Sequence, residues 1–320
     1  MRKNLSMRQR LLLPVVLLIL LMWPGCENNF SPVVDYNKQL VIYGVLSPRS
    51  DSQYVRVYTN YNPSGNDPSG QTTDTGVHGA IVTMMDDLTT YRFKETAIPR
   101  DTTIRYSSDI VEYVGFPCRL RPGKIYSLAI NSDQGRATAL VFVPSHGFLF
   151  VNTPMSLTDP RSALDDISVT LGISPWARGY LVRLFINFDV MVGQNWEPRR
   201  VEVPSFGDSL MTPGAYGYST LTFGPSGSTS TAVFRREAYL GILKQQIERP
   251  YGGSFRLTTA TFVLTQVDQN LFNYYNTVNG YQDLYTIRLD QPDFTNINRG
   301  VGLFGAMVED STEVWIQGLY

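Results

Sequence analysis

The sequence predicts a mainly β protein, and three features support this fold class. Short runs rich in Val, Ile, Tyr and Phe recur about every 10–15 residues through the first half of the chain, as expected for strands. Clusters of Gly, Pro, Asn, Asp and Ser separate these runs, and no convincing helix lies between them. With 43% hydrophobic residues, the 320-residue chain has ample material for packed cores. We therefore predict a β-sandwich followed by a β-rich domain that carries one or two helices.

The predicted sandwich occupies residues 37–144. Residues 39–46 form a continuous run of mostly β-branched, aromatic and aliphatic side chains, and in residues 54–58 both valines fall on one face. The polar stretch 60–75 holds three Gly/Pro turn signals and is predicted to be a long loop. Residues 144–147, Pro-Ser-His-Gly, are the predicted linker to the next domain. The strands predicted in the sandwich are residues 39–46, 54–58, 80–85, 91–93, 125–130 and 137–143.

The second predicted domain, residues 145–320, begins with strand-like sequence. Residues 179–190 are predicted to form one long strand with an apolar face and a polar face. Residues 203–231 are rich in Gly, Ser, Pro and Thr and are predicted to be a long excursion. Further strands are predicted at residues 255–265, 300–307 and 313–316. The apolar face of the long strand consists of Tyr180, Val182, Leu184, Ile186 and Phe188.

Two helices are predicted in this second domain. Residues 232–249 carry apolar side chains at helical spacing, and Pro250 would end the helix. Residues 268–281 would start with Asp268 as N-cap. No internal repeat and no coiled-coil pattern is evident.

The first 25 residues have the layout of a bacterial export signal. Four basic residues precede an apolar run, residues 11–23, that is shorter than the about 20 residues of a membrane-spanning helix. Its basic flank and the small residue before the cut are typical of a removable signal. A retained anchor helix is the alternative, and the prolines at positions 14 and 24, which bracket the run, count against it.

Cys26 closes this segment at the position where a bacterial lipoprotein signal is cut. We expect Cys26 to be acylated, with palmitate among the chains, because stable anchoring takes more than one acyl chain. Residues 26–36 then form a polar tether, and the membrane is the first partner of the protein. The alternative is ordinary secretion, with Cys26 an unmodified residue of the mature chain.

Charge and cysteine content narrow the function classes. Removing the four basic residues of the signal from the 27 Lys+Arg leaves 23, against 28 Asp+Glu, so the mature chain carries a net charge of −5. This charge argues against nucleic acid as a partner. With Cys26 acylated, Cys118 has no disulfide partner, and its apolar neighbours predict a buried small hydrophobe. A reactive thiol is the alternative role for Cys118.

Residues 300–306, Gly-Val-Gly-Leu-Phe-Gly-Ala, match the glycine spacing of a dinucleotide-binding loop. That loop needs a following helix and an acidic residue about 20 positions further on. Only 14 residues follow Ala306, and they resemble a turn and a strand. We expect no cofactor here, and we expect the glycines to mark places where strands bend or pack closely.

The two histidines, His78 and His146, belong to no recognisable catalytic or zinc motif, so we expect structural or surface roles. The chain also lacks the ligand spacing of a metal site. Calcium binding by the loop at residues 62–67 is a further alternative, but the loop lacks the alternating acidic residues of a calcium loop.

Two pairs of adjacent carboxylates were considered as catalytic groups. Asp86-Asp87 and Asp165-Asp166 would each point to opposite faces of a strand, so the members of a pair could not act together. Two carboxylates facing each other across a sugar, as in glycosidases, remain an alternative. We expect no catalytic residues and predict that the protein is not an enzyme.

Tyrosine is abundant, with 19 residues, and several lie next to asparagine, as in residues 58–61 and 273–276. Amphipathic rings are suited to protein interfaces and to stacking on sugars. Strands also use tyrosine for packing, so this feature favours binding only weakly.

Several segments together resemble one known family, the outer-membrane lipoproteins of Bacteroidota-type bacteria that are described as domain of unknown function 4249. The resemblance implies an immunoglobulin-like sandwich followed by a β-rich domain, and it has no catalytic residues to carry over. It also suggests an outer-membrane location and association with a TonB-dependent uptake receptor. The residues that carry it are Cys26-Glu27, 40–46 (LVIYGVL), 77–82 (VHGAIV), 120–128 (LRPGKIYSL) and 294–306 (FTNINRGVGLFGA).

The sequence thus predicts a lipid-anchored outer-membrane protein that acts as a non-enzymatic binding or accessory subunit. Which face of the membrane it occupies does not follow from the sequence. The alternatives are a surface module that captures glycans or peptides and a hydrolase of surface polymers.

Overall fold

The computed structural model of the chain describes residues 36–61, 74–100, 108–152, 166–205, 217–223, 229–279 and 294–316. Residues Lys38–Tyr320 form one compact unit. The predicted signal, the acylation site Cys26 and the loop at residues 62–67 lie outside the described residues. Of the helices within the described ranges, none is long and apolar enough to cross a membrane.

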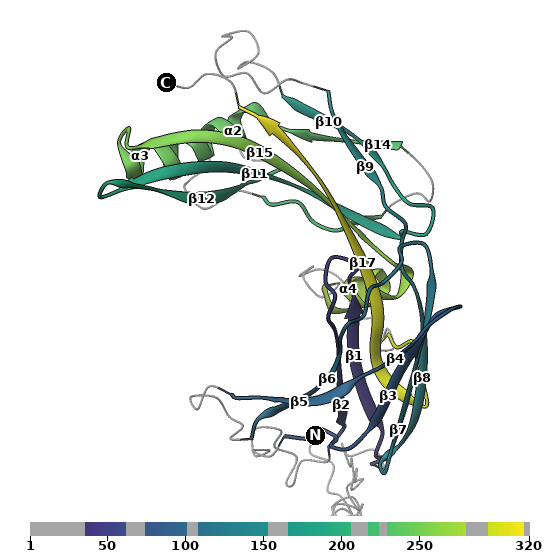
Figure 1. The fold of residues 1–320 in the computed structure, drawn as a ribbon. Coiled ribbons are helices and arrows are strands. Elements are labelled where there is room, and N and C mark those ends of the chain that lie inside the picture. Colours follow the sequence, from purple (N-terminus) through teal and green to yellow (C-terminus); the bar gives the residue numbers. More distant parts are fainter. Residues whose placement is uncertain are drawn as a thin grey trace, which may run out of the picture. The chain divides into compact units, whose positions relative to one another are not determined.

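The fold is mainly β, as predicted, and its N-terminal part is a two-layer sandwich (Figure 1). One layer contains β1 (Leu40–Leu46), β2 (Gln53–Thr59), β6 (Ile110–Gly115) and β5 (Lys94–Ile98). The other layer is a five-stranded sheet in the order β16-β8-β7-β3-β4, formed by Ile297–Asn298, Gly135–Phe142, Ile125–Ser132, Ile81–Met85 and Thr90–Arg92. All six strands predicted for the sandwich are present, whereas β5 and β6 were not predicted.

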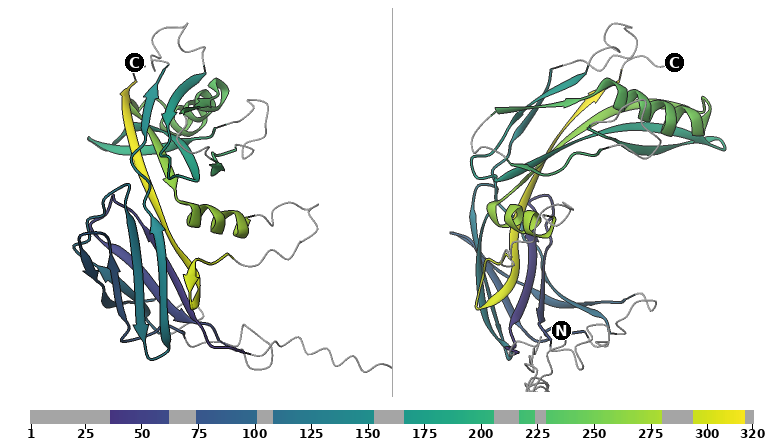
Figure 2. Two further views of the ribbon diagram at one scale, coloured as in Figure 1. Left: turned by 90° about the vertical axis from the view of Figure 1, so that its right-hand side faces the viewer. Right: turned by 180° about the vertical axis from the view of Figure 1, so that it is seen from behind.

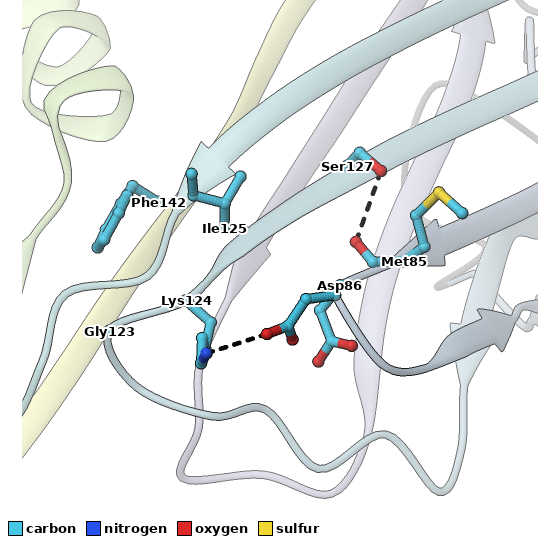
Figure 3. A pocket seen from close by; sticks show the side chains of 8 residues that line it. Met85, Asp86, Gly123, Lys124, Ile125, Ser127 and Phe142 are labelled. Atoms are coloured by element: carbon cyan, nitrogen blue, oxygen red, sulfur yellow. Dashed lines mark hydrogen bonds and ion pairs between the residues drawn. The ribbon is translucent and has the colours of Figure 1, made fainter.

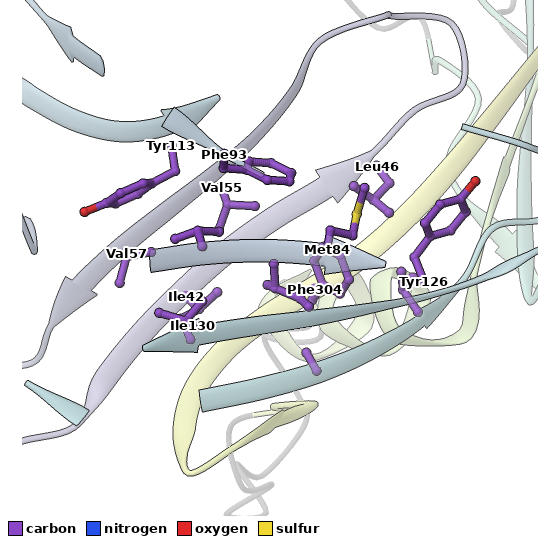
Figure 4. Close-up of a cluster of buried hydrophobic side chains, with 14 of the residues drawn as sticks. Ile42, Leu46, Val55, Val57, Met84, Phe93, Tyr113, Tyr126, Ile130 and Phe304 are labelled. Carbon is purple, nitrogen blue, oxygen red and sulfur yellow. The ribbon is translucent and has the colours of Figure 1, made fainter. Parts of the chain in front are cut away.

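One apolar core lies between the two layers (Figure 4). Val55 and Val57 point into it from one layer, and Leu128 and Ile130 point into it from the other. Because side chains alternate along a strand, each of these strands buries every second residue. Burying one such aliphatic side chain contributes about 1.5–3 kcal/mol. The core therefore fixes which side chains of the five-stranded sheet face outward.

The last strand, β17 (Gly300–Trp315), joins the sandwich to the second part of the molecule. Residues Gly300 to Ala306 pair in parallel with β1, and residues Met307 to Trp315 pair antiparallel with β15 (Phe255–Val267). The two strands predicted at residues 300–307 and 313–316 are therefore one strand, and that prediction was wrong. The polar residues Glu309, Asp310 and Ser311 suggested a turn, but they lie within the sheet.

A nine-stranded sheet results, in the order β12-β11-β15-β17-β1-β2-β6-β5, with β13 (Thr222–Phe223) paired to β11. The long predicted strand is β11 (Gly179–Val192), which buries the predicted apolar face except for the half-buried Tyr180. β12 (Asn195–Val203) pairs with it and was not predicted. Because β17 and β16 complete both layers of the sandwich, strands from beyond residue 144 take part in the first domain. The boundary between residues 144 and 145 stays a prediction.

A second core lies on one face of β11 and β15. A three-stranded sheet of β14 (Thr229–Phe234), β10 (Ile167–Gly172) and β9 (Phe148–Val151) contributes to it. A continuous helical segment also contributes, formed by α2 (Arg236–Ile242), the π-helix η4 (Leu243–Glu248) and α3 (Arg249–Tyr251). Figure 2 shows this segment alongside the long strands.

The helix predicted at residues 232–249 was wrong at both ends. Residues Thr229 to Phe234 form β14 instead, because they pair with β10 and place Phe234 against Phe262, with ring centroids 5.9 Å apart. The helix begins only at Arg236, whose N–H donates to Asp166 (2.9 Å). It also continues past Pro250 and ends at Tyr251, so the proline removes one helical N–H donor close to the C-terminal end of the segment.

The glycines of residues 300–306 allow β17 to approach β1 closely. Gly302 has a φ of +116°, and a Cβ atom at this position would lie 2.1 Å from the carbonyl oxygen of Ile42. A Cβ atom at Gly305 would lie 2.9 Å from Leu271 of α4 (Gln269–Asn279). The expectation that these glycines mark close strand packing is confirmed.

Asp268 joins α4 to β17. Its Oδ1 accepts hydrogen bonds from the N–H groups of Leu271 (3.0 Å) and Ala306 (2.9 Å), and its Oδ2 accepts from Asn270 N–H (3.0 Å). Its own N–H donates to the Ala306 carbonyl (3.0 Å). The predicted N-cap is confirmed, and the same carboxylate also holds the neighbouring strand. Burial raises the pKa of Asp268 to about 6, despite the three N–H donors that lower it.

We predict that Gly302→Ala lowers the free energy of unfolding by at least about 3 kcal/mol or prevents folding, because the new methyl group meets the β1 backbone. Gly193→Ala is the matched control, since Gly193 also has a positive φ (+65°) but no atom within 4 Å of an added Cβ. It should cost only about 1–2 kcal/mol. Urea denaturation measures both values, and equal costs would contradict the close-packing role.

We predict that Asp268 makes the protein more stable in acid than at neutral pH. Its folded-state pKa of about 6 exceeds the 3.8 of an exposed aspartate, so the folded state binds the proton more tightly. The resulting stability is present below pH 3.8 and is lost as the pH rises to about 6. The shift corresponds to about 3 kcal/mol. The free energy of unfolding should therefore fall by about 3 kcal/mol less between pH 4 and pH 7 in Asp268→Asn than in the wild-type protein.

Asp86→Asn is the control of opposite sign. Burial raises the pKa of Asp86, but hydrogen bonds from Arg121 and from the N–H groups of Leu88 and Thr89 outweigh it, so the pKa is lowered. This carboxylate stabilises the fold above pH 3.8, and the stability is lost as the pH falls through its lowered pKa. The pH dependence of urea denaturation should therefore change in opposite directions in the two variants. A change of the same sign would contradict the assignment of Asp268.

Candidate binding surface

The outward face of the five-stranded sheet carries a strip of exposed apolar side chains. Met85 lies opposite Ser127, which in turn lies opposite Leu140, and Ile125 lies opposite Phe142. Each of these positions alternates with a core residue, so the side chains point to solvent. Met85, Ile125 and Leu140 are 51, 56 and 63% exposed. Such a row is unusual where a sheet faces water, since the outward positions are then normally polar.

A pocket of about 450 Å³ lies at one end of this strip (Figure 3). Met85 and Ile125 form its apolar part, and Ser127 lies between them with its hydroxyl 3.5 Å from the Met85 carbonyl oxygen. At the rim, the ammonium group of Lys124 lies 3.0 Å from an oxygen of Asp87. The pocket therefore combines an apolar floor with a charged edge.

Arg121 organises the acidic part of this rim. Its Nη2 lies 2.8 Å from Asp86 and also binds Asp87. Hydrogen bonds from Lys124 and Arg121 lower the pKa of Asp87 against the effect of burial. The two carboxylates lie in the turn after β3, where a sequence of two adjacent aspartates is expected, and there they bind the same guanidinium, so the alternation of a strand does not separate them.

A second pocket, of about 530 Å³, lies at the other end of the strip. Trp176 stacks on Phe142 there, with ring centroids 4.3 Å apart and an angle of 25° between the rings. Arg178 also lines the pocket, and its guanidinium lies 4.2 Å from the ring centroid of Phe223. Asn270, at the start of α4, donates a hydrogen bond from Nδ2 to the carbonyl oxygen of Leu140 (3.1 Å).

The two pockets form one surface because both are lined by Ile125 and Phe142. We call it the β7–β8 surface and define it by the five side chains Met85, Ile125, Leu140, Phe142 and Trp176. Charged or amide groups flank it at each end, namely Lys124 with its carboxylate partners and Arg178 with Asn270. An apolar centre with a polar rim is the arrangement found at protein interfaces.

Side chains occupy the edge of β8 beside this surface. Within the described strands, β16 pairs with β8 only at Thr138 and Ala139. Beyond that point, the Leu140 carbonyl oxygen accepts hydrogen bonds from the side chains of Asn270 and Asn296, so these amides fix the edge of the second pocket.

The two histidines each contact a carboxylate, in line with the structural or surface roles expected for them. His78 Nδ1 lies 2.7 Å from Glu95, and His146 Nδ1 lies 2.6 Å from Asp310. Asp310 also accepts the N–H of Gly147 (2.8 Å), so the predicted linker at residues 144–147 is bound to β17. No group of three or more His, Cys, Asp or Glu side chains suitable for a metal ion occurs in the parts of the chain that the structure describes.

Cys118 is fully buried in the first core, as predicted. Burial, together with the charge of Asp86, raises the pKa of its thiol to about 12. Asp166 accepts the N–H of Arg236 at the start of α2 and forms an ion pair with Arg235. Both contacts lower the pKa of Asp166, and they outweigh burial, which raises it. Its neighbour in the predicted pair, residue 165, lies outside the described residues.

The β7–β8 surface was not predicted from the sequence. A signal was present, because residues 125–130 (IYSLAI) place apolar side chains on both faces of one strand, as Ile125 precedes the buried Tyr126. The tyrosine-rich segments that favoured binding are not part of the β7–β8 surface. Tyr274 of one such segment packs edge-on against Tyr43, with ring centroids 6.2 Å apart.

Comparisons with known proteins give one family and no close relative. The family model described as domain of unknown function (DUF4249) matches residues 27–174. No curated protein matches the chain. A solved structure of the C-terminal globular domain of an oligosaccharyltransferase from Pyrococcus abyssi is similar at 11% identity and a TM-score of 0.23. The match covers 95% of this chain and 58% of that chain.

The family match covers strands β1 to β10 and all of the β7–β8 surface except Trp176. It agrees with the resemblance seen in the sequence. Residues 27–174 are thus similar to the DUF4249 model, and they supply most of the candidate binding surface.

Proposed function

We propose that the protein is a lipid-anchored, non-enzymatic binding or accessory subunit of the outer membrane that holds a partner protein on the β7–β8 surface. A TonB-dependent uptake receptor is the first partner to test, as the family resemblance suggests. The observation that supports binding is the exposed row of Met85, Ile125 and Leu140 on a sheet face that the fold leaves uncovered.

The energetic argument rests on apolar area. Exposed apolar clusters with a polar rim mark interaction sites, because a partner removes their area from water. Fully covering one large side chain contributes about 1.5–3 kcal/mol, so the five partly exposed residues of the surface contribute to binding but do not by themselves set the affinity. Aromatic anchors such as Trp176, which already rests on Phe142, lose little conformational freedom on binding.

The length of the β7–β8 surface suits an extended partner segment. Such a segment would lie across the apolar side chains from one pocket to the other. Its charged residues would meet Arg178 at one end or the Asp87–Lys124 pair at the other. These charges would fix the direction of the segment more than its affinity.

A surface module that captures glycans or peptides is the second candidate function. The stacked Trp176 and Phe142 beside the amide of Asn270 favour it, because sugars bind to exposed rings flanked by hydrogen-bonding groups. This alternative uses the same surface but needs no receptor.

We predict that Leu140→Asp abolishes recovery of the receptor when the tagged protein is isolated from native outer membranes in mild detergent. The substitution places a charge in the centre of the apolar row, at a side chain that is 63% exposed. Ile81→Asp is the matched control, because Ile81 is 64% exposed on the outward face of the same sheet. Both variants should melt within a few degrees of wild type.

Three results would contradict this proposal. The wild-type protein could be recovered alone, Leu140→Asp could retain the receptor, or Ile81→Asp could lose it equally. Recovery of the wild-type protein alone, together with binding on glycan or peptide arrays that Leu140→Asp abolishes, would support the second candidate function instead.

We further predict that Cys26 carries the lipid. Cells grown with labelled palmitate should incorporate label into the wild-type protein. They should also incorporate it into the Cys118→Ser variant, because the thiol of Cys118 is buried in the core and does not carry the lipid. Cys26→Ser should incorporate none and should appear in the soluble fraction. Labelling that persists in Cys26→Ser would exclude acylation at this site.

A further inference from the structure

The nine-stranded sheet has an uncovered face along β12, β11, β15 and β17. Residues of β11 that point away from the second core include Arg183, Phe185 and Asn187, which alternate with buried residues. Strand pairing places Arg200 opposite Asn187 and Glu202 opposite Phe185. This face is remote in sequence and in strand position from the β7–β8 surface, which lies on another sheet.

Two arginines on this face lie against a single ring, and a third shares a carboxylate with one of them. The guanidinium carbons of Arg200 and Arg183 lie 3.6 and 5.2 Å from the ring centroid of Phe185. Arg183 also lies 3.6 Å from Glu309, which binds Arg49 at 2.7 Å. We call Arg49, Arg183 and Arg200 with Phe185 and Glu309 the arginine cluster.

Arg200 is the arginine of the cluster that has no ion pair. Glu309 is shared by Arg49 and Arg183, and no carboxylate of the described residues lies within ion-pair distance of Arg200, although Glu202 and Glu313 lie on the same face of the sheet. Burial and the charges of Arg183 and Arg49 lower the pKa of Arg200, against the smaller opposing effect of Glu202 and Glu309. An anion placed here would relieve this repulsion.

Arg183 adds an independent sign of a missing acceptor. Its Nε atom is buried and has no hydrogen-bond partner among the described residues. A buried donor without an acceptor destabilises the fold, so such groups are normally paired. The planar guanidinium presents its donors in a fork that fits the two oxygens of a carboxylate or of a phosphate.

The neighbours of the cluster favour a sugar as the carrier of the anion. Strand pairing forms one row across the sheet from Arg200 through Asn187 and Thr259 to Trp315. Asn187 Nδ2 donates to Thr259 Oγ1 (2.9 Å) and to Thr261 Oγ1 (2.7 Å), and the buried Thr259 donates in turn to Glu313. Trp315 is 77% exposed at the end of this row. Hydroxyl and amide groups between a cation and an aromatic ring match the chemistry of an acidic sugar chain.

We propose that the arginine cluster and the row from Arg200 to Trp315 form a binding site for an acidic oligosaccharide. The sugar carboxylate binds Arg200 and Arg183, and the following sugar rings contact the row and Trp315. The site goes beyond the proposed function because it uses none of the residues of the β7–β8 surface. Nucleic acid does not fit the net negative charge of the mature chain.

The test is binding of the full-length protein in detergent to a panel of uronic acid oligosaccharides and to their methyl-esterified forms. Esterification removes the carboxylate charge and keeps the sugar, so the acidic forms should bind at least tenfold more tightly. Arg200→Gln should weaken binding of the acidic forms at least tenfold. Arg199→Gln is the matched control, because Arg199 lies opposite Phe188 on the other face of β12 and pairs with Glu197 at 2.6 Å.

A third arm separates a sugar site from a simple anion site. Inorganic phosphate should compete only weakly with the acidic oligosaccharides, since it cannot contact Trp315, and Trp315→Ala should weaken oligosaccharide binding without changing phosphate binding. Leu140→Asp should leave both unchanged, which keeps this result separate from the test of the partner surface.

Several outcomes would overturn the proposal. These are no binding by any acidic member of the panel, equal binding of the esterified forms, equal losses in Arg199→Gln and Arg200→Gln, or displacement by phosphate at matched concentration. All variants change exposed or half-exposed side chains, so thermal unfolding should stay close to that of wild type and a folding defect would be seen directly.

Discussion

The parallel pairing of β17 with β1 is the constraint on which the rest of the fold depends. It joins Leu40 to Gly300, so the sandwich cannot complete its own layer until the end of the chain is in place. The entropy cost of closing such a long loop grows only slowly with its length. The pairing offsets this cost because it buries Phe304, Ala306 and Val308 in the first core. Only glycine permits the approach at position 302.

The same strand also positions both candidate surfaces. On the sandwich side, Asp268 fixes the start of α4 to Ala306, and this places Asn270 beside Leu140 at the edge of the second pocket. On the other side, Glu309 holds Arg49 and Arg183 in the arginine cluster. A disturbance of β17 would therefore reach both surfaces.

Much of the sandwich could be predicted from the sequence because its strands are runs of β-branched, aromatic and aliphatic residues bounded by turn residues. β1 and β7 are such runs, and in β2 the two valines alternate with other residues. Asp268 was identified as an N-cap from its place before an apolar periodic run. The weak strands were missed for a physical reason. β5 is almost wholly exposed and β12 is mostly polar, so neither carries a hydrophobic signal, and pairing with a neighbour alone makes them strands.

The candidate surfaces could not be predicted in the same way, because each depends on pairing between distant strands. Nothing local in the sequence indicates that Ile125 faces Phe142, or that Arg200 reaches the ring of Phe185. The helix expected at residues 232–249 failed for the same reason. Its first residues obey a helical spacing as well as a strand alternation, and the partner strand β10 decides between the two.

The composition of the outward face of the five-stranded sheet argues that its apolar row serves binding and not stability. The next row along the same strands, Thr83, Ala129 and Thr138, is small or polar, and the fold accommodates it without difficulty. Stability would thus be served equally well by threonine or serine at Met85 and Leu140, and solubility would be served better. Side chains that cost solubility and add nothing to the core are expected where a partner covers them. By the same reasoning, the like charges of the arginine cluster are expected where an anion neutralises them.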